Sequence, residues 1–484
     1  MTAVWLFGDQ VGFARGLDRP VVLIESRAAL RRHRYHRQKV HLVLSAMRHL
    51  AAELGDRCSY IVADTYRDGL REFGEKVAVF EPGSHAAEDL VRRLEHDGVV
   101  EQVMPTRGFA LSKADFAEWA GSRESFLMEN FYREQRRRFG ILMDGVEPTG
   151  GRWNLDEDNR EPPPSGGLSV GRAYRPRESK VDEEVREHID GLGLDLVGRD
   201  GPRLFAVTRQ EALRALRRFL DERLTDFGAY EDAMMGGDWT MAHSLLSVPL
   251  NLGLLDPLEV VEAAEERYRQ GKAPLNSVEG FVRQILGWRE YVWHLYWRFG
   301  PEYLRHNHLG AHQRLPDWWA DLDGEAVQAA CLRTAMEGVR DRGWTHHIQR
   351  LMVLGNHALQ RGFQPAELTR WFATAFVDGF PWVMPVNVIG MSQHADGGLM
   401  ATKPYAAGGA YINRMSDHCG DCVFDPKSRL GEDACPFTAG YWAFLYTNNH
   451  TLAGNRRMAR PLAAARKLSD GEQVWRQESA REQF

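Results

Sequence analysis

The first 105 residues alternate short apolar runs with stretches in which apolar residues recur every three or four positions. Gln38–Leu54 and Ala87–Leu94 have this helical spacing. The short runs, which we expect to be buried strands, are Val4–Phe7, Val21–Ile24, Tyr60–Val62 and Val77–Phe80. Strands that alternate with helices are typical of a parallel sheet, which binds ligands at the carboxyl ends of its strands. We therefore predict an α/β domain over residues 1–130.

The regular pattern weakens between Asp156 and Asp200. Asn159–Gly167 contains three consecutive prolines followed by Ser-Gly-Gly, so it cannot hold a regular helix or strand. A segment of this length in a compact protein usually runs over the surface between two domains. We predict an interdomain linker over residues 131–205.

Helical spacing returns after the linker. Thr208 and Glu211 have the spacing of a capping box at the start of a helix. Apolar residues then follow at helical spacing, namely Leu213, Leu216, Leu220 and Leu224. Further helices are predicted over Val278–Trp297, His347–Gln360 and Ala366–Phe376. Residues 206–484 should therefore form a larger, all-helical domain.

Composition narrows the class of protein. The 484 residues suffice for two or three domains, and 43% hydrophobic with 26% charged residues is ordinary for a globular protein. Without an apolar run of about eighteen residues or a leader-like N-terminus, we expect a cytoplasmic, monomeric protein with no membrane span. The net charge of −6 excludes a protein coated in basic residues, but binding DNA needs only a local basic face. Candidates for that face are Arg136, Arg137, Arg138 and Lys403.

Four of the five cysteines lie in the predicted helical domain, at Cys331, Cys419, Cys422 and Cys435. The last three form a C-x2-C-x12-C pattern with a proline directly after the final cysteine. A C-x2-C pair brings two thiolates onto one metal centre, and two further cysteines complete a set of four ligands. The remaining Cys58 is expected to be an ordinary core residue. The spacing leaves both zinc and an iron–sulfur cluster open.

Nine segments, spread in consistent order over nearly the whole chain, resemble one family, the iron–sulfur bacterial photolyases and cryptochromes. These segments are Phe7–Gln10, Ser45–His49, Gly150–Asn154, Ala273–Phe281, Gly287–Tyr291, His346–Met352, Asn387–Ser392, Thr402–Tyr405 and Tyr411–Asp417. The best-known members of that family repair pyrimidine (6-4) pyrimidone photoproducts. The resemblance implies a photolyase/cryptochrome-like fold with FAD in the helical domain and a [4Fe–4S] cluster on the four cysteines. It also implies an antenna chromophore, 6,7-dimethyl-8-ribityllumazine in relatives, in the α/β domain.

The resemblance also implies which residues hold these groups. Asn387 would face the flavin N5 atom, where plant-type photoreceptors carry an aspartate, and the amide favours repair over sensing. Asp9, Gln10 and Glu25 would contact the antenna. The other residues expected to bind FAD are Ser244, Leu245, Ser247, Arg283, Gln284, Arg289, Arg350 and Asp378.

Reversal of a (6-4) lesion needs an electron, a proton and a lesion that is flipped out of the duplex. A histidine suits the proton transfer because its ordinary pKa is near neutrality. The resemblance assigns proton donation to His347 and the orientation of that ring, or contact with the lesion, to His346. Tyr405 and Tyr411 would contact the flipped bases. Trp371 and Trp319 would relay electrons to the flavin.

The sequence thus predicts a light-driven (6-4) photolyase that acts on UV-damaged DNA. One alternative is a cryptochrome-type blue-light receptor with the same cofactors. A second is a photolyase for cyclobutane dimers. The third belongs to another class: a helical nucleic-acid-binding protein with a structural metal and no photochemistry.

Overall fold

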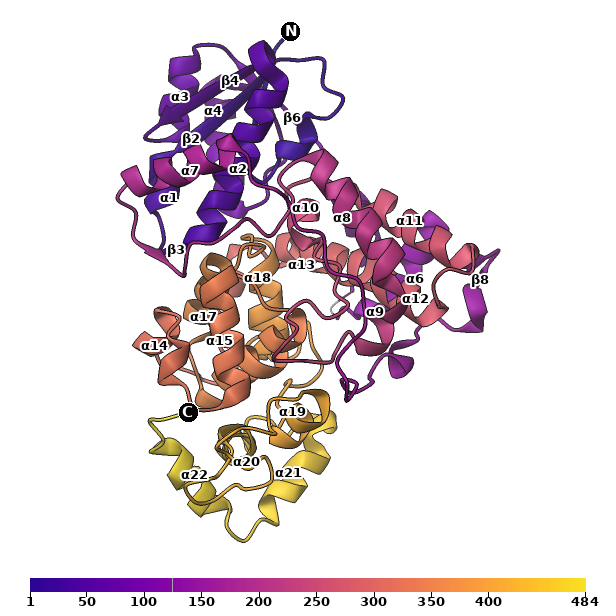
Figure 1. Cartoon of the computed structure of the whole chain (residues 1–484), viewed down its shortest axis with the longest axis vertical. Helices are drawn as coiled ribbons and strands as arrows, with labels where there is room; N and C mark the ends of the chain where they lie inside the picture. Colours follow the sequence, from indigo (N-terminus) through magenta and orange to yellow (C-terminus); the bar gives the residue numbers. More distant parts are fainter. Residues whose placement is uncertain (124) are drawn as a thin grey trace.

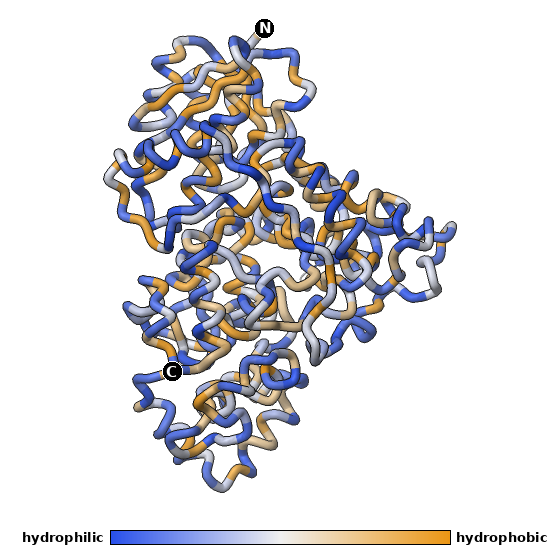
Figure 2. Tube along the Cα trace, viewed as in Figure 1, coloured by the Kyte–Doolittle hydropathy of each residue, from blue (hydrophilic) through white to orange (hydrophobic). Residues whose placement is uncertain are grey.

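The computed structural model describes residues 1–123 and 125–484. Its N-terminal part is a five-stranded sheet in the order β4-β2-β1-β5-β6, and every neighbouring pair of strands is parallel. Figure 1 shows this sheet at the top of the molecule, and Figure 2 shows its strands as apolar segments. The strands are β1 (Ala3–Leu6), β2 (Val21–Ser26), β4 (Cys58–Ala63), β5 (Val77–Phe80) and β6 (Val100–Met104).

Helices cover both faces of this sheet. Val4 and Leu6 of β1 pack in one core with Leu44 of α2 (Arg37–Leu54). Trp5, on the opposite face, packs with residues of α3 (Tyr66–Phe73) and α4 (His85–His96). Burial on both faces explains why the strands are continuous apolar runs rather than alternating ones.

The four predicted strands and both predicted helices of this region are confirmed. The fifth strand, β6, was missed because it lies at the edge of the sheet and exposes Glu101 and Gln102, which interrupt the apolar run. The sequence also did not predict α3 or the short α1 (Arg27–Arg31). β3 (Tyr35–His36) pairs with β9 (Leu196–Val197) outside the main sheet.

The segment predicted as a linker contains a helix that the sequence analysis missed. α7 (Lys180–Gly191) begins with a capping box formed by Ser179 and Asp182, and it packs against α2. Residues 159–167 hold neither helix nor strand, as expected from their prolines and glycines. The predicted boundary at residue 130 falls inside α6 (Met128–Phe139). The domain limits stay predictions.

The rest of the chain is helical, as predicted. α8 begins at the predicted capping residue Thr208, whose hydroxyl accepts from the Glu211 N–H at 3.3 Å. Within the described residues, no helix has the length and apolar character that a membrane crossing requires. The main helices are α5 (Lys113–Ala120), α8 (Arg209–Glu222), α9 (Leu224–Tyr230), α10 (Ser247–Asn251), α11 (Pro257–Arg269), α12 (Leu275–Val282), α13 (Glu290–Phe299), α14 (Asp317–Ala320), α15 (Ala330–Arg342), α16 (Asn356–Arg361), α17 (Pro365–Ala375), α18 (Val383–Pro385), α19 (Gly409–Met415), α20 (Pro436–Thr447), α21 (Ala459–Arg466) and α22 (Gly471–Ser479).

Three segments of the helical region have the wider turns of a π-helix: η5 (Arg283–Arg289), η8 (Gln349–Gly355) and η9 (Val386–Ser392). η5 continues α12 into α13, so the single helix predicted over Val278–Trp297 is one continuous rod with a π-helical middle. Widened turns are rare and occur frequently at functional sites. Each of the three carries at least one residue predicted to bind FAD.

Candidate functional site

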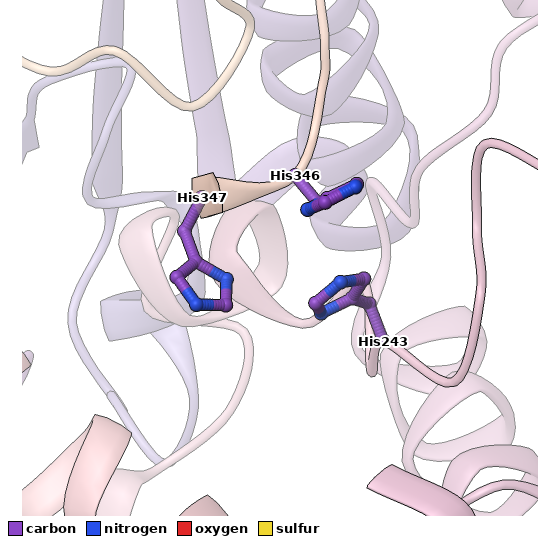
Figure 3. Close-up of side chains that lie close together, drawn as sticks. All are labelled: His243, His346 and His347. Carbon is purple, nitrogen blue, oxygen red and sulfur yellow. The ribbon is translucent and has the colours of Figure 1, made fainter. Parts of the chain in front are cut away.

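Three histidines meet where two distant parts of the helical region come together (Figure 3). His346 and His347 follow the end of α15, and His243 comes from the loop before α10. The ring centroids of His243 and His346 are 4.7 Å apart, and those of His243 and His347 are 5.4 Å apart. One ring nitrogen of each residue lies within 4.8 Å of the other two. The sequence analysis assigned no role to His243, which directly precedes the predicted FAD residue Ser244.

The three rings differ in burial. His346 is 2% exposed, and neither of its ring nitrogens has a hydrogen-bond partner among the described residues. Burial lowers the pKa of His243 and of His346 well below 6.5, so both rings are neutral at physiological pH. The side chain of His347 is 46% exposed, and its Nε2 atom lies 3.5 Å from Asp232 Oδ1. His347 is therefore the one ring of the three that is accessible from outside and also lies beside a carboxylate.

The loop that carries His243 is held in an unusual conformation. The buried Arg223 guanidinium donates to the carbonyl oxygens of His243 and Thr240, each at 3.2 Å. Met241 and Leu245 have φ angles of 43° and 57°, in the left-handed region that non-glycine residues rarely adopt. Such backbone strain persists where the surroundings enforce it, and it is concentrated at functional sites.

Three residues predicted to bind FAD meet beside this loop. Arg350 of η8 makes two hydrogen bonds with the Asp378 carboxylate, at 2.9 and 3.1 Å, and the Ser247 hydroxyl donates to the same carboxylate at 2.7 Å. Arg350 Nε also donates to the Thr345 carbonyl at 2.7 Å. This last bond connects the Asp378 cluster to the segment that bears His346 and His347.

A second group of predicted residues lies on η5. Arg283 is 4% exposed and donates to Asn154 Oδ1 at 3.0 Å and to Glu279 Oε2 at 3.3 Å. The Gln284 amide lies 3.5 Å from a carboxylate oxygen of Glu231. Burial, reinforced by the charge of Asp232, raises the pKa of Glu231 to about 8, so this carboxyl is protonated at neutral pH.

The two predicted tyrosines belong to the same electrostatic environment. Burial raises the pKa of Tyr405 and of Tyr411, and the charges of Asp232 and Arg160 act on both hydroxyls. Both tyrosines are half-buried. The charge of Asp232, which lies beside His347, therefore also acts on the hydroxyls of Tyr405 and Tyr411.

Two further residues predicted to bind FAD, Asn387 and Arg289, make different contacts. Asn387 lies on η9, and its amide donates to the Val383 carbonyl at 2.8 Å. Arg289 instead donates to the carbonyls of Gly108 and Leu250, at 2.8 and 3.2 Å. It lines a pocket together with Asp9 and Gln10, two residues predicted for the antenna.

This Asp9 pocket lies between the sheet and the helical region and has aromatic walls, formed in part by Phe109, Trp293 and Trp382. A Cβ atom on Gly83 would lie 2.6 Å from Asp9 Oδ2, so the glycine makes room for that carboxylate. Burial raises the pKa of Asp9 to about 6. An aromatic pocket with a few convergent polar groups suits a flat ring ligand.

Glu25, the third residue predicted for the antenna, is not among the residues that line the Asp9 pocket. It is 1% exposed, accepts from the Tyr60 hydroxyl at 2.6 Å and also contacts His188. His188 belongs to α7, so Glu25 joins the sheet to the helix that the sequence analysis missed.

The four predicted cysteines line one pocket, whose other walls include Ile412, Phe424 and Phe437. Cys331 lies in the first turn of α15, and Cys435 directly precedes α20. Burial and the neighbouring thiols raise the pKa of Cys331 far above 9, and they raise that of Cys419 to about 12. A pocket lined by four thiols is suited to a cation, which stabilises their thiolates. The donor set fits zinc and an iron–sulfur cluster equally.

Trp319 and Trp371 are both buried and in contact. Their ring centroids are 5.2 Å apart, and the Trp371 indole N–H donates to the Trp319 carbonyl at 3.2 Å. Both rings belong to the hydrophobic core that contains Cys331 and Cys435. The structure therefore brings the two predicted relay residues together, in the same hydrophobic core as two of the four cysteines.

The prediction of a DNA contact is wrong for Arg136. Its side chain is fully buried, and it donates to the carbonyls of Ile141 and Trp153 at 3.3 and 3.1 Å. Arg137, Arg138 and Lys403 are exposed, so for them the prediction stands.

Comparison with known proteins identifies the family. The profile of the family described as deoxyribodipyrimidine photo-lyase-related protein matches residues 5–203. A relative from Agrobacterium fabrum, named (6-4) photolyase, is 41% identical over 496 aligned positions that cover 96% of each chain. The chain belongs to the deoxyribodipyrimidine photo-lyase-related family.

Solved structures of photolyases share the fold of this family member. A bacterial class III photolyase from Agrobacterium tumefaciens matches with a TM-score of 0.57 and 16% identity, over 99% of this chain and 90% of its own. An archaeal photolyase from Sulfolobus tokodaii, solved with two FAD molecules, matches with a TM-score of 0.54 and 16% identity, over 82% and 84% of the two chains. The photolyase fold predicted from the sequence is thus confirmed.

Proposed function

We propose that this protein is a light-driven DNA repair enzyme that reverses pyrimidine (6-4) pyrimidone photoproducts. The observation that carries the proposal is the position of His347, an accessible imidazole beside Asp232 and joined through Thr345 to the Arg350–Asp378 pair. The (6-4) photolyase from Agrobacterium fabrum, 41% identical over 96% of both chains, supports the same reaction.

We assign to His347 the donation of the proton that the lesion takes up during repair; because the overall reaction is an isomerisation, the proton is returned. Its Nε2 atom faces Asp232, and this carboxylate orients the ring and stabilises positive charge on it. His346 and His243 are kept neutral by burial, so they do not repel that charge. Tyr405 and Tyr411 present half-buried rings near Asp232, where a flipped-out base can contact them.

FAD is the cofactor that the family implies, and in its reduced, light-excited form it supplies the electron. The residues present fit such a group: Arg350 and Asp378 form a fixed ion pair, and the loop of Ser244, Leu245 and Ser247 is held in a strained conformation. Arg283, Gln284 and Asn387 lie on the π-helical segments η5 and η9 and complete the proposed set. We assign Arg289 instead to the Asp9 pocket, where it packs 4.3 Å from the Phe109 ring.

We assign a [4Fe–4S] cluster to Cys331, Cys419, Cys422 and Cys435. The support is the enclosed pocket that all four line and the resemblance in their spacing. Trp371 and Trp319 pack in the same core and would pass electrons to the flavin site. A ribolumazine antenna is assigned to the pocket of Asp9 and Gln10, whose aromatic walls suit stacking on a flat ring. Damaged DNA is the partner, and we propose that the protein acts as a cytoplasmic monomer.

The decisive experiment is a repair assay with purified protein and two DNA substrates, one with a (6-4) photoproduct and one with a cyclobutane dimer. Under blue light we expect loss of the (6-4) lesion only, measured by chromatography, and no reaction in the dark. Photoreduction of the protein without loss of either lesion would instead indicate a cryptochrome-type receptor. Repair of the cyclobutane dimer alone would indicate the other class of photolyase.

The variant His347→Ala tests the proton donor. Loss of a general acid should lower turnover by roughly 100-fold or more, whereas bound FAD should stay at the wild-type amount. His450→Ala, which removes an exposed histidine near the C-terminus, is the matched control and should repair at the wild-type rate. Wild-type turnover in His347→Ala would contradict the assignment of the acid.

A further inference from the structure

The start of α2, in the α/β domain, reaches into the helical region with a buried ammonium group. Lys39 is 8% exposed, and its Nζ atom donates to the carbonyl oxygens of Ala373, Phe376 and Gly379 at 2.6, 3.1 and 2.6 Å. A lysine has three N–H donors, and here each meets one acceptor. Figure 1 shows β3, which leads into α2, next to α17, and these two elements are in contact.

Two neighbouring residues make the same kind of contact with a second helix. Gln38 Nε2 donates to the Asp341 carbonyl at 2.6 Å, and the His36 ring lies 3.1 Å from the Arg340 carbonyl oxygen. Ala373 belongs to the last turn of α17, and Arg340 and Asp341 belong to the last turn of α15. The last carbonyls of a helix lack partners within that helix and carry partial negative charge, so donors from another domain satisfy them well.

The two helix ends that α2 contacts are the ones that lead into the proposed site. α15 ends at Arg342, five residues before His347. α17 ends at Ala375, and Asp378 follows between Phe376 and Gly379, the residues whose carbonyls Lys39 binds. Arg350 then joins the two segments, because its Nε donates to the Thr345 carbonyl and its other nitrogens donate to the Asp378 carboxylate.

We propose that Lys39, with Gln38 and His36, is a positioning residue for the repair site: through it the α/β domain fixes the segments that carry Asp378 and His347. Lys39 touches neither substrate nor flavin and acts through the carbonyls that flank Asp378. The α/β domain therefore has a role in repair that is independent of any antenna. This proposal goes beyond the proposed function, because it concerns how the site is held rather than which reaction occurs there.

The test is the variant Lys39→Met, which keeps the length of the side chain and removes all three donors. We expect the affinity for FAD to fall by about tenfold or more, because the Asp378 segment loses its anchor. Repair per bound flavin should fall by roughly 10- to 100-fold, the range expected when reacting groups shift by up to about 1 Å. The KM for damaged DNA should stay unchanged, since Lys39 does not contact DNA.

Hydrogen–deuterium exchange supplies a readout that requires neither flavin nor repair. In the flavin-free protein, Lys39→Met should speed amide exchange in residues 343–349 and 376–380. Lys39→Arg, which keeps the charge and several N–H donors, should restore part of the protection and part of the FAD affinity. If Lys39→Met does not fold, Gln38→Ala tests the same contact through α15, with faster exchange expected in residues 343–349.

Arg37→Met is the matched control on the same helix. Arg37 pairs with Asp190 and Asp200, both outside the helical region, and within the described residues it makes no hydrogen bond or ion pair with either helix end. It should leave FAD affinity and exchange in the two segments unchanged. Equal effects of Arg37→Met and Lys39→Met, or wild-type exchange and FAD affinity in Lys39→Met, would overturn the proposal. Failure of the repair assay alone would not affect it, because exchange and FAD affinity are measured without lesions.

Discussion

A single helix, α15, connects the cysteine pocket to the histidine site. Burial shifts the pKa values of the buried groups in opposite directions at the two sites. Cys331 lies in the first turn of α15, and His346 follows the end of the same helix. Burial raises the pKa of Cys331 and Cys419, so these thiols stay protonated. Burial lowers the pKa of His346 and His243, so these imidazoles lose their protons. In both places the neutral form is favoured.

The two sites differ in what allows their side chains to become charged. The cysteine pocket offers four like groups, and only a metal centre lets them become thiolates together. The histidine site contains one group that is not enclosed, His347, and a carboxylate, Asp232, lies beside it. Ionisation of the cysteine pocket would thus depend on a bound ion, whereas the histidine site keeps one accessible imidazole next to two neutral ones. Each of the variants below changes one side chain that contributes to this difference.

The largest effect is expected from Cys331→Ser. Loss of one thiolate should remove the metal centre, and because such centres contribute to folding, the free energy of unfolding should fall by several kcal/mol. The measurements are iron and zinc content, visible absorption and denaturant unfolding. Iron with broad visible absorption in the wild type would identify a cluster, and zinc without such absorption would identify the simpler site.

Cys58→Ser is the matched control for that variant. Cys58 lies in β4 of the α/β domain and is not among the residues that line the cysteine pocket. It should leave metal content and visible absorption unchanged. Full metal content in Cys331→Ser would show that this thiol is not a ligand.

A smaller effect is expected from Asp232→Asn, which preserves shape but removes the carboxylate charge beside His347. Turnover should fall by about tenfold, which corresponds to about 1.4 kcal/mol of lost stabilisation of the charged ring. Glu88→Gln is the matched control, because Glu88 pairs with the His85 ring at 4.0 Å in the α/β domain. The measurement is the repair yield per absorbed photon at saturating DNA. Equal yields in Asp232→Asn and the wild type would mean that His347 works without the carboxylate.

The sequence predicted the cysteine pocket more completely than the histidine site. The cysteines of the pocket could be predicted as a group because three of them lie within seventeen residues, in a spacing that itself suggests metal binding. The buried strands were equally accessible, since burial on both faces of the sheet produces continuous apolar runs such as Val77–Phe80. In both cases the signal is local in the chain.

The histidine site could be predicted only in part, because long-range packing assembles it. His346 and His347 were found by family resemblance, but His243 lies about a hundred residues earlier and has no pattern of its own. Arg289 shares η5 with Arg283, yet its side chain points to the Asp9 pocket. The widened turns of η5 change which side chains share a face, and a regular helical spacing cannot anticipate that.

Glu231 extends the contrast to a carboxyl group and gives the smallest expected effect on repair. It is 4% exposed, and its pKa of about 8 in the folded protein is above the ordinary value of 4.5. Between these two values the folded state binds more protons than the unfolded state, so stability falls as the pH rises. The contribution of Glu231 is fully present below pH 4.5 and is lost as the pH rises through about 8.

The variant Glu231→Gln cannot ionise and should remove this dependence. Relative to the wild type, its free energy of unfolding should rise by about 3 kcal/mol between pH 5.5 and pH 8.5, because the wild type loses about 1.4 kcal/mol per pH unit over most of that range. Urea unfolding of both proteins at the two pH values measures the difference, and comparison with the wild type cancels the other titrating groups. Parallel curves for the two proteins would mean that Glu231 is already ionised in the folded state. The rule that burial favours the neutral form would then not hold beside Asp232, and the neutrality of the nearby histidines would need a different explanation.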